Sequence, residues 1–372
     1  MTQLTIPSIP FHSRLKGRPR ERCWLLEIER ESLDAVLHQL YQDIDKHGRQ
    51  HGGGTRGDKL GGTVELLGVA LRITNPRARI SRSENRGKPF SALGELLWYL
   101  SGSDKLAFIK PYVSEYENDA VDGVLEGAYG PRLMAMRGEI NQFDSIEQLL
   151  QRKPGSRRAV VQLFNAEDIV TDHKEIPCTT TLQFHLRDDR LHLSVTLRSN
   201  DAYWGLPHDV FCFTMIQEMM ARRLEAELGE YYQYVGSMHV YEKYLPDMRA
   251  YLEEGVQQVH AMPPMPTGNP FDLIPQLLEI EGRLREGQRV KPASEMSDPY
   301  WGDIVRLLQV FWSRRQSGSK EEHVRRLEEI RGELASASYK PYVDGRKDLP
   351  IRAAAKKAVG DSESGTAGDV AK

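Results

Sequence analysis

Apolar residues recur along this chain at two spacings, and each spacing predicts a different kind of element. Between Leu25 and Ile44 they fall three or four positions apart, as on one face of a helix. The segment TVELLGVALRI, residues 63–73, alternates in part and predicts a strand. The segment SALGELLWYLSG predicts a short apolar helix in which Glu95 is the only acid. The N-terminal part of the chain therefore mixes helices with strands.

A pair of alternating segments follows Cys178. In TTLQFHLRDDRLHLSVTLRS the apolar positions alternate on both sides of the two aspartates at 188–189, which are a turn signal. Folding the chain there places Cys178 opposite Ser199, with Arg198 alongside. The pattern predicts a hairpin whose open end brings together a thiol, a guanidinium and a hydroxyl.

Further helices are expected downstream, at residues 210–224, 271–285, 301–312 and 320–334. The stretch PPMPTGNP reads as a linker before the last three of them. These changes divide the chain into a flexible arm at 1–22, a main domain at 23–262, a helical extension at 263–345 and a disordered tail at 346–372.

Composition narrows the protein class. With 372 residues, 40% hydrophobic and 28% charged, the chain has the balance of a soluble globular protein. The net charge of -3 gives no global basic field, so no nucleic-acid partner is expected. No apolar run is long enough to cross a bilayer, and the N-terminus lacks the order of a secretory signal. The 3 cysteines lie far apart, which supports neither a disulfide framework nor a metal site. We expect a cytoplasmic protein with reduced thiols and no membrane partner.

Two segments have an open interpretation from the residues alone. The glycine-rich loop HGRQHGGGTRGDKLGG carries Arg56 and Lys59, and it suits either phosphate binding or a mobile surface loop. Glu95 either points outward or is buried. If it is buried, its pKa should rise, because burial disfavours the charged form, and that would suit general acid–base catalysis.

The candidate nucleophile and the candidate phosphate ligands also have plain structural alternatives. A single cysteine after proline, as at Cys178, is more often structural than catalytic, but a nearby guanidinium enriches the reactive thiolate. The pair Arg157 and Arg158 offers two adjacent cations that suit a phosphate, or else forms a solvated turn.

Seven motifs, in order between about Tyr41 and Tyr244, resemble those of the thymidylate synthase family. Three of them resemble its catalytic segments: GELLWYLSG with the catalytic glutamate at Glu95, GAYGPRLM with the active-site tyrosine at Tyr129, and IPC with the nucleophile at Cys178.

The other four motifs resemble the family's substrate-binding segments. They are SRR with the phosphate arginines Arg157 and Arg158, LRSND with Arg198, Ser199 and Asp201, GLPHDV with Gly205 and Asp209, and GSMHVY with the sugar-binding His239 and Tyr241. A basic residue of the glycine-rich loop, Arg56 or Lys59, is expected to close over the phosphate.

The resemblance implies a mixed α/β (α+β) fold, in which a large twisted mixed sheet is packed with helices. It also implies 5,10-methylenetetrahydrofolate as co-substrate, a pyrimidine nucleoside monophosphate as substrate and no metal. The family is homodimeric, so Arg157 and Arg158 are expected to reach into the partner's site.

Departures from the family pattern change the expected reaction. The GLPHDV turn carries His208 and Asp209 where the family has phenylalanine and asparagine. The family asparagine reads uracil, whereas a carboxyl group can accept from the amino group of cytosine and, in its acid form, serve N3. The chain also ends in a polar segment instead of a short apolar tail. The family's folate-flanking tryptophan has no clear equivalent, and the segment PYVSEYEN offers Val113 and Tyr116 nearby. An open site would let water intercept the intermediate.

The sequence therefore predicts a CMP or dCMP C5 hydroxymethylase that works through a Cys178 adduct at C6 of the base. In it, Glu95 and Tyr129 serve the proton network and Asp209 stabilises charge at N3 and N4. Alternatives are a thymidylate synthase acting on dUMP, a deoxycytidylate methylase, or a non-catalytic nucleotide- or RNA-binding homologue. The choice between ribose and deoxyribose stays open.

Overall fold

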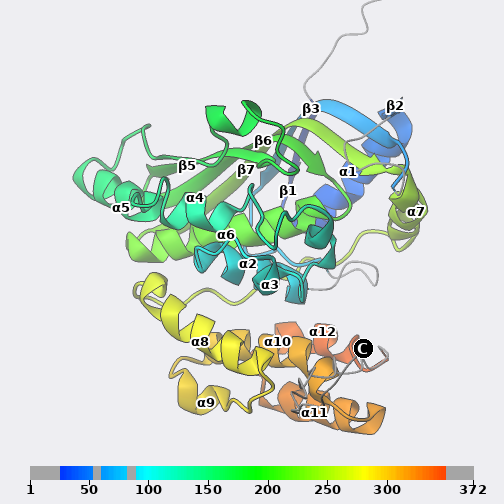
Figure 1. The fold of residues 1–372 in the computed structure, drawn as a ribbon, viewed down its shortest axis with the longest axis vertical. Coiled ribbons are helices and arrows are strands. Elements are labelled where there is room, and N and C mark those ends of the chain that lie inside the picture. The colour runs from blue at the N-terminus through cyan, green and yellow to red at the C-terminus, as the bar shows by residue number, and fades with distance from the viewer. Residues whose placement is uncertain (1–25, 53–59, 82–88, 349–372) are drawn as a thin grey trace, which may run out of the picture.

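The computed structural model describes residues 26–52, 60–81 and 89–348, which include a seven-stranded sheet packed with helices on one face (Figure 1). Its strand order is β1-β3-β7-β6-β5-β4, with β2 paired to β3 off this path. The pairs β1–β3 and β6–β7 are parallel and the others are antiparallel. The predicted mixed α/β fold with a mixed sheet is confirmed.

The strands are β1 (Leu26–Arg30), β2 (Arg49–His51), β3 (Thr63–Ile73), β4 (Val160–Gln162), β5 (Thr179–Arg187), β6 (Arg190–Asp201) and β7 (Glu227–Tyr241). The helices up to the linker are α1 (Leu33–His47), α2 (Pro89–Leu100), α3 (Leu106–Ile109), α4 (Tyr129–Met134), α5 (Gln142–Arg152), α6 (Gly205–Arg223) and α7 (Leu245–Glu253). The later ones are α8 (Ile274–Arg285), α9 (Pro292–Glu295), α10 (Pro299–Gln316), α11 (Lys320–Glu333) and α12 (Lys340–Asp344). Short 3-10 turns include η1 (Ser114–Asn118).

The predicted β5–β6 hairpin is present, and its turn residues Asp188 and Asp189 both have positive φ, as a tight two-residue hairpin turn requires. The predicted register at its open end is wrong by one residue. A β-bulge between Thr179 and Thr181 shifts the pairing, so the Cys178 carbonyl accepts from the backbone N–H of Arg198 at 2.9 Å. Cys178 therefore lies opposite Arg198 and not opposite Ser199.

Helix α6 packs against β6 and β7 on one face of the sheet, and α2 packs on α6. Helix α6 is apolar on nearly all sides, which is typical of a helix enclosed between two layers. It begins at Gly205, not at Val210 as predicted, because a proline such as Pro207 is tolerated in the first turn of a helix. Asp209 consequently lies within the helix and not beyond a separate turn.

The helices predicted after the linker are found as α8, α10 and α11, and α10 packs on α2 (Figure 1). Tyr112 joins the two parts: its hydroxyl donates to Glu281 of α8 at 2.7 Å and accepts from Trp312 of α10 at 3.1 Å. A Cβ at Gly94 of α2 would lie 2.1 Å from the Tyr112 ring, so this contact requires glycine. The extension is thus packed directly behind the helix that carries Glu95.

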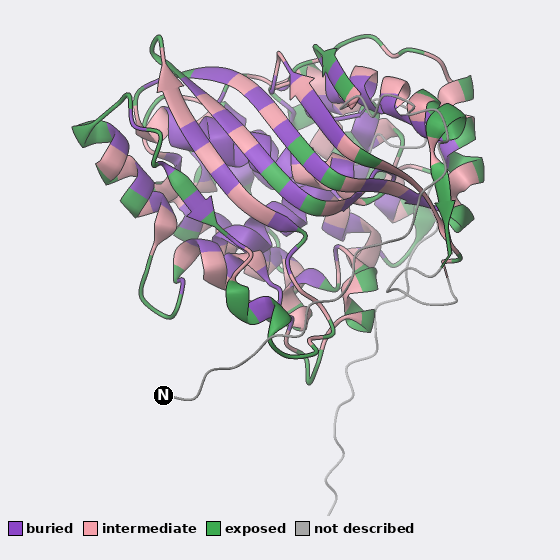
Figure 2. Cartoon of the chain, turned by 90° about the horizontal axis from the view of Figure 1, so that it is seen from above, coloured by how far each residue is buried: buried purple, intermediate pink, exposed green. Residues whose placement is uncertain are grey.

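The other face of the sheet is not covered by any helix of the described chain in the view of Figure 2. Along β6, buried residues alternate with exposed or half-exposed ones, as expected for a sheet with one packed face. Within the described residues, no helix combines the length and apolar character needed to cross a membrane. The predicted arm at 1–22, the loop residues Arg56 and Lys59, and nearly all of the predicted tail lie outside the described residues.

Candidate active site

Cys178 immediately precedes β5, and its side chain is exposed. The Arg198 guanidinium lies against it, with Nη2 3.7 Å from the thiol sulfur. The same guanidinium donates to the carbonyls of Ile176 and Pro177 at 3.1 and 2.9 Å, so its position is fixed by backbone atoms. A fixed positive charge beside a thiol favours the nucleophilic thiolate.

Tyr129 is hydrogen-bonded to Thr179, the residue that follows this cysteine. The Tyr129 hydroxyl donates to the Thr179 side chain and accepts from its backbone N–H, both at 3.0 Å. Burial raises the pKa of Tyr129, and the nearby charges of Cys178 and Asp209 raise it further. The phenol therefore stays protonated and available as a hydrogen-bond donor at neutral pH.

Glu95 is buried, which resolves the alternatives that its sequence context left open. Its Oε1 accepts from the hydroxyls of Tyr99 at 3.1 Å and Tyr116 at 2.7 Å, and its Oε2 lies 2.6 Å from His208 Nδ1. Burial alone would raise the pKa of Glu95, but the hydrogen bond and charge of His208, with the two phenols, outweigh it and lower the pKa. The predicted rise is wrong, because three donors favour the ionised form.

The pKa of Asp209 is shifted in the opposite direction to that of Glu95, although both residues belong to the same cluster. Its Oδ2 accepts from the Asn200 amide at 2.7 Å, and Asn200 in turn accepts from Gln233 at 3.0 Å. Burial raises the pKa of Asp209 well above its ordinary value, and the charge of Glu95 raises it further. Two neighbouring carboxyl groups with pKa values moved in opposite directions can hold one acid and one base at the same pH.

Gly205 allows the close approach around Asp209. A Cβ at this position would meet the Asn200 amide nitrogen at 3.1 Å and Asp209 Oδ2 at 3.9 Å. Glycine therefore leaves room for the hydrogen bond between Asn200 and Asp209, which supports its place among the candidate site residues.

The predicted sugar-side residues lie on the adjoining ends of β6 and β7. Ser199 pairs with Ser237, and Asp201 pairs with His239. The rings of His239 and Tyr241 lie edge to face, with centroids 5.1 Å apart. The two parallel strands thus bring these predicted residues together at their C-terminal ends, where β6 is followed by α6.

Arg157 and Arg158 lie in the exposed turn before β4. In the part of the chain that the structure describes, no hydrogen bond or ion pair joins either guanidinium to the cluster around Cys178. Arg56, the remaining predicted phosphate ligand, lies outside the described residues.

Four further residues belong to the cluster: Tyr99, Tyr116 and His208 around Glu95, and Asn200 beside Asp209. From the sequence, His208 and Tyr116 were named only at departures from the family pattern, and Tyr99 and Asn200 were not selected. Tyr99 lies one helical turn after Glu95, a spacing that places both side chains on one face. Asn200 lies inside the LRSND motif, between two residues that were selected. For Tyr116, which lies 21 positions from Glu95, sequence spacing gave no signal.

A metal-ion site has no support in the described residues, where no three histidine, cysteine, aspartate or glutamate side chains converge. The polar groups of the cluster instead face one another as hydrogen-bond donors and acceptors. This arrangement can bind a neutral or anionic ligand and move protons, and the exposed Cys178 thiol beside it is a candidate nucleophile.

Similar proteins include a "Deoxyuridylate hydroxymethyltransferase" from Bacillus phage SP01, 34% identical over 240 residues, which are 60% of this chain and 61% of that protein. A "Thymidylate synthase" of Bacillus phage phi3T is 33% identical over 200 residues, 51% of this chain and 71% of that one. A "Thymidylate synthase" of Francisella philomiragia is 26% identical over 216 residues, 54% and 79% of the two chains. This chain therefore spans less than two thirds of the phage SP01 relative.

The family model for thymidylate synthase matches residues 37–270, which include every candidate site residue named above and more than half of the chain. The relatives above are named as a hydroxymethyltransferase and as thymidylate synthases. With Cys178, Glu95 and Asp209 all inside the matched segment, the chain belongs to the thymidylate synthase family.

Proposed function

We propose that the protein is a C5 hydroxymethyltransferase that converts CMP or dCMP to the 5-hydroxymethyl nucleotide, with 5,10-methylenetetrahydrofolate as the second substrate. The observation that carries this proposal is the state of Asp209. Its pKa is raised well above the ordinary value, by burial first and then by the Glu95 charge, which favours the acid form.

Asn200 determines which oxygen of Asp209 carries the proton. Because the Asn200 amide donates to Oδ2, that oxygen is kept as an acceptor, and the proton resides on Oδ1. A carboxylic acid oriented in this way offers one acceptor and one donor side by side. Cytosine presents the matching pair, an amino donor at C4 and an acceptor at N3. The wrong base leaves buried polar groups unpaired, which is a strong basis for discrimination.

Covalent catalysis begins at Cys178. Its thiolate, stabilised by Arg198, adds to C6 of the base, and C5 then attacks the methylene carbon supplied by the folate substrate. Asp209 stabilises the charge that develops at N3 and N4. Loss of the C5 proton, with Glu95 and Tyr129 as the available proton-handling groups, leaves an exocyclic methylene on the base after the folate product departs.

The ionised state of Glu95 supports water as the final nucleophile. A carboxylate has about four acceptor sites, and Glu95 uses three of them, so one is left to orient a water molecule toward the exocyclic methylene. Addition of that water, followed by expulsion of Cys178, gives the hydroxymethyl product.

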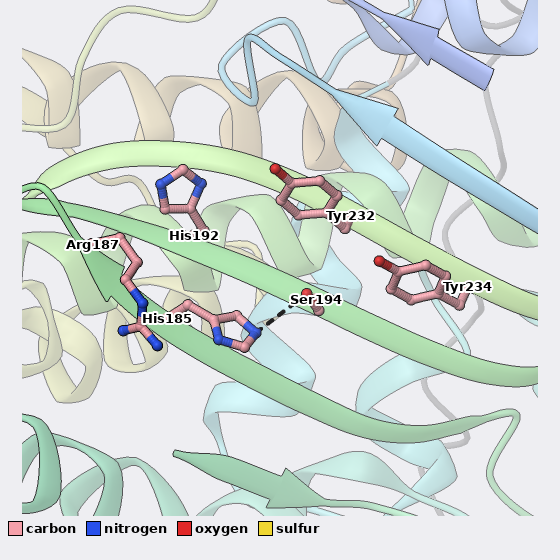
Figure 3. Close-up of a pocket in the computed structure, with 6 residues that line it drawn as sticks. All are labelled: His185, Arg187, His192, Ser194, Tyr232 and Tyr234. Carbon is pink, nitrogen blue, oxygen red and sulfur yellow. Dashed lines mark hydrogen bonds between the residues drawn. The ribbon is translucent and has the colours of Figure 1, made fainter. Parts of the chain in front are cut away.

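We also propose a homodimer in which Arg157 and Arg158 bind the phosphate in the partner's site, beside the partner's own phosphate ligands. Both arginines are exposed and lack an ion pair within the described chain. In this dimer, the second copy packs against the uncovered face of the sheet. Figure 3 shows His185, Arg187, His192, Ser194, Tyr232 and Tyr234 lining a hollow on it.

Mixing experiments test this dimer. Cys178→Ala and the double variant Arg157→Ala/Arg158→Ala should each be inactive alone, whereas their mixture should regain activity after subunit exchange. Complementation arises because a mixed dimer contains one site with both the thiol and the arginines. A monomeric mass in solution, or no regain of activity, would contradict the proposal.

Substrate choice is tested by incubating the protein with methylenetetrahydrofolate and CMP, dCMP or dUMP, each tritiated at C5. We expect tritium release from a cytosine nucleotide and a product heavier by a hydroxymethyl group. The name of the phage SP01 relative favours a second candidate, hydroxymethylation of dUMP. Release from dUMP with a hydroxymethyl product would select that candidate, and a methyl product with dihydrofolate would indicate a synthase. If Cys178→Ala leaves binding intact and no substrate reacts with the unmodified protein, the chain is a non-catalytic nucleotide-binding homologue.

A further inference from the structure

His208 lies between Glu95 and Ser91, two residues of α2 that it reaches from the first turns of α6. Its Nδ1 is 2.6 Å from Glu95 Oε2, and its Nε2 is 3.0 Å from the Ser91 hydroxyl. The imidazole and the carboxylate are both largely buried, with side chains 16% and 6% exposed. Ser91 is half-buried, so exposure increases along the row from Glu95 through His208 to Ser91.

The hydrogen-bond pattern fixes the proton positions along this row. Glu95 Oε1 already accepts from Tyr99 and Tyr116, whose pKa values are raised by burial and by the Glu95 charge, so both phenols remain donors. The carboxylate has only acceptor capacity, and His208 Nδ1 must therefore be the donor to Oε2. Nε2 then accepts from the Ser91 hydroxyl in the neutral ring and donates to it in the charged ring.

We propose that His208 is a positioning residue for Glu95, which keeps the carboxylate ionised and oriented and exchanges its protons with the outside through Ser91. This inference rests on the proposed function. Imidazole suits this role because its two ring nitrogen atoms can bond to two partners at once, here Glu95 and Ser91. A hydroxyl, which is both donor and acceptor, passes the proton on by rotating.

The proposed reaction needs such a relay, although it releases no net proton. In one turnover the C5–H bond and one O–H bond of water break, and each gives up a proton. The tetrahydrofolate product gains two protons, one at each of the two nitrogen atoms that held the methylene carbon. Because these gains and losses occur at different steps, a group beside Glu95 must hold a proton between them.

Other titratable groups around the pair do not provide this function. They are Tyr99 on α2, Tyr116 on η1, Tyr129 on α4, and Asp209 and Cys212 on α6. The phenols and the buried Cys212 thiol have raised pKa values, from burial first and then from neighbouring negative charge, and remain protonated. Asp209 is raised in the same way. In this set, His208 is the group that can take a positive charge beside the Glu95 carboxylate.

Three variants separate positioning from proton exchange. His208→Phe removes both nitrogen atoms, His208→Asn keeps a donor near Nδ1 but neither titrates nor reaches Ser91, and Ser91→Ala removes only the outer end. His47→Asn, at the exposed end of α1, is the matched control. The readouts are the pH profile of C5 tritium release and the infrared band of a protonated carboxyl group, assigned to Glu95 by its absence in Glu95→Gln.

In His208→Phe the acidic limb of the rate profile should move to higher pH, because the buried carboxylate loses its strongest donor and its pKa rises. The rate at pH 7 should fall about 10- to 100-fold, the effect of one hydrogen bond to a charged group. His208→Asn should restore the position of the limb but keep a reduced kcat with an unchanged KM. Ser91→Ala should share the reduced kcat, and the control should match the unmodified protein.

An unshifted profile in His208→Phe, with no carboxyl band appearing near neutral pH, would overturn the inference. A kcat of Ser91→Ala and His208→Asn equal to that of the unmodified protein would overturn the relay. If the unmodified protein catalyses no folate-dependent reaction, the proposed function fails. The infrared titration of Glu95 in the His208 variants still decides the positioning role in that case, so the two failures are distinguishable.

Discussion

Two carboxyl groups of the site, those of Glu95 and Asp209, have similar ordinary pKa values but are moved apart by their neighbours. Glu95 is surrounded by donors from His208 and two tyrosines, whereas Asp209 receives one hydrogen bond and faces the Glu95 charge. At the scale of single residues, the chemistry therefore depends on which group beside each carboxyl can donate. This difference leads to two predictions for position 209.

Replacing Asp209 with asparagine should shift the preference from cytosine toward uracil nucleotides. With its oxygen toward Asn200, the amide presents the same acceptor and donor as the Asp209 acid. When it and Asn200 turn over together, the amide donates to O4 and accepts from N3–H, so the variant gains the reading of uracil. We expect the ratio of kcat/KM values, cytosine over uracil nucleotide, to fall by about 100-fold or more. Steady-state kinetics on CMP, dCMP and dUMP measure it, with the exposed Asp172→Asn as control. An unchanged ratio would mean that another residue reads the base.

The same substitution should stabilise the protein without ligand, by an amount that depends on pH. Because the folded pKa of Asp209 is raised, the unfolded chain loses this proton at lower pH than the folded chain does. Stability therefore falls as pH rises from the ordinary aspartate value of about 3.9 up to the folded pKa. Asp209→Asn lacks this loss, so its advantage in the free energy of unfolding should grow from about pH 4 upward. Urea unfolding across pH tests this; a constant difference would contradict it.

At the scale of elements, an ion-pair cluster at α6 joins it to the chain after β3 and to the linker. Glu218 of α6 is fully buried, pairs with Arg79, and lies 2.7 Å from Arg77 Nε. The backbone N–H of Met265 donates to the same carboxylate at 3.0 Å. Burial would raise the pKa of Glu218, but the two guanidinium groups and this N–H outweigh it and lower the pKa.

Glu218→Gln should destabilise the fold by about 3–5 kcal/mol, because it leaves the buried Arg79 charge without its partner. The depressed pKa of Glu218 means that its contribution is present above the ordinary glutamate pKa of about 4.3 and is lost as pH falls through the folded value. Urea unfolding at pH 7 should therefore show the full difference from the unmodified protein, and a smaller one in acid. Glu253→Gln, at the exposed end of α7, should have little effect. Equal stabilities at pH 7 would contradict the prediction.

Element types were predicted well where periodicity is local, and less well where one residue shifts a register. The strand at 63–73, the helix around Glu95 and the hairpin turn at 188–189 were all predicted from patterns within one segment. The bulge near Thr179 was not, because alternation in β5 continues after it and gives no sign of the extra residue. Strand β1 was also missed, since its residues 26–30 are mostly charged and exposed.

At the scale of the whole molecule, the extension beyond the family match forms one hydrophobic core with the rest of the described chain. Tyr112 is central to this junction, because its hydroxyl bonds to Glu281 and Trp312 and its ring packs on Gly94 of α2. Its segment continues into Tyr116, which donates to Glu95. The extension therefore supports the helix and the turn that hold the Glu95 carboxylate.

Tyr112→Phe should cost about 1–3 kcal/mol, because the buried Trp312 N–H and a Glu281 oxygen lose a partner. Hydrogen–deuterium exchange should accelerate in α2, α8 and α10 together, since these helices open as one cooperative unit. Tyr234→Phe, on the exposed sheet face, is the control. Faster exchange confined to α8 and α10 would show instead that the extension unfolds by itself.

The sequence by itself determined most element types, the order of the motifs and most of the candidate site residues, because spacing and motif chemistry are local properties of the chain. Only the tertiary structure decided the charge states. Glu95 and His208 are 113 positions apart, and the sign of the Glu95 pKa shift depends on that contact. The pKa of a buried group is the balance between desolvation and its neighbours, and those neighbours are chosen by packing between elements.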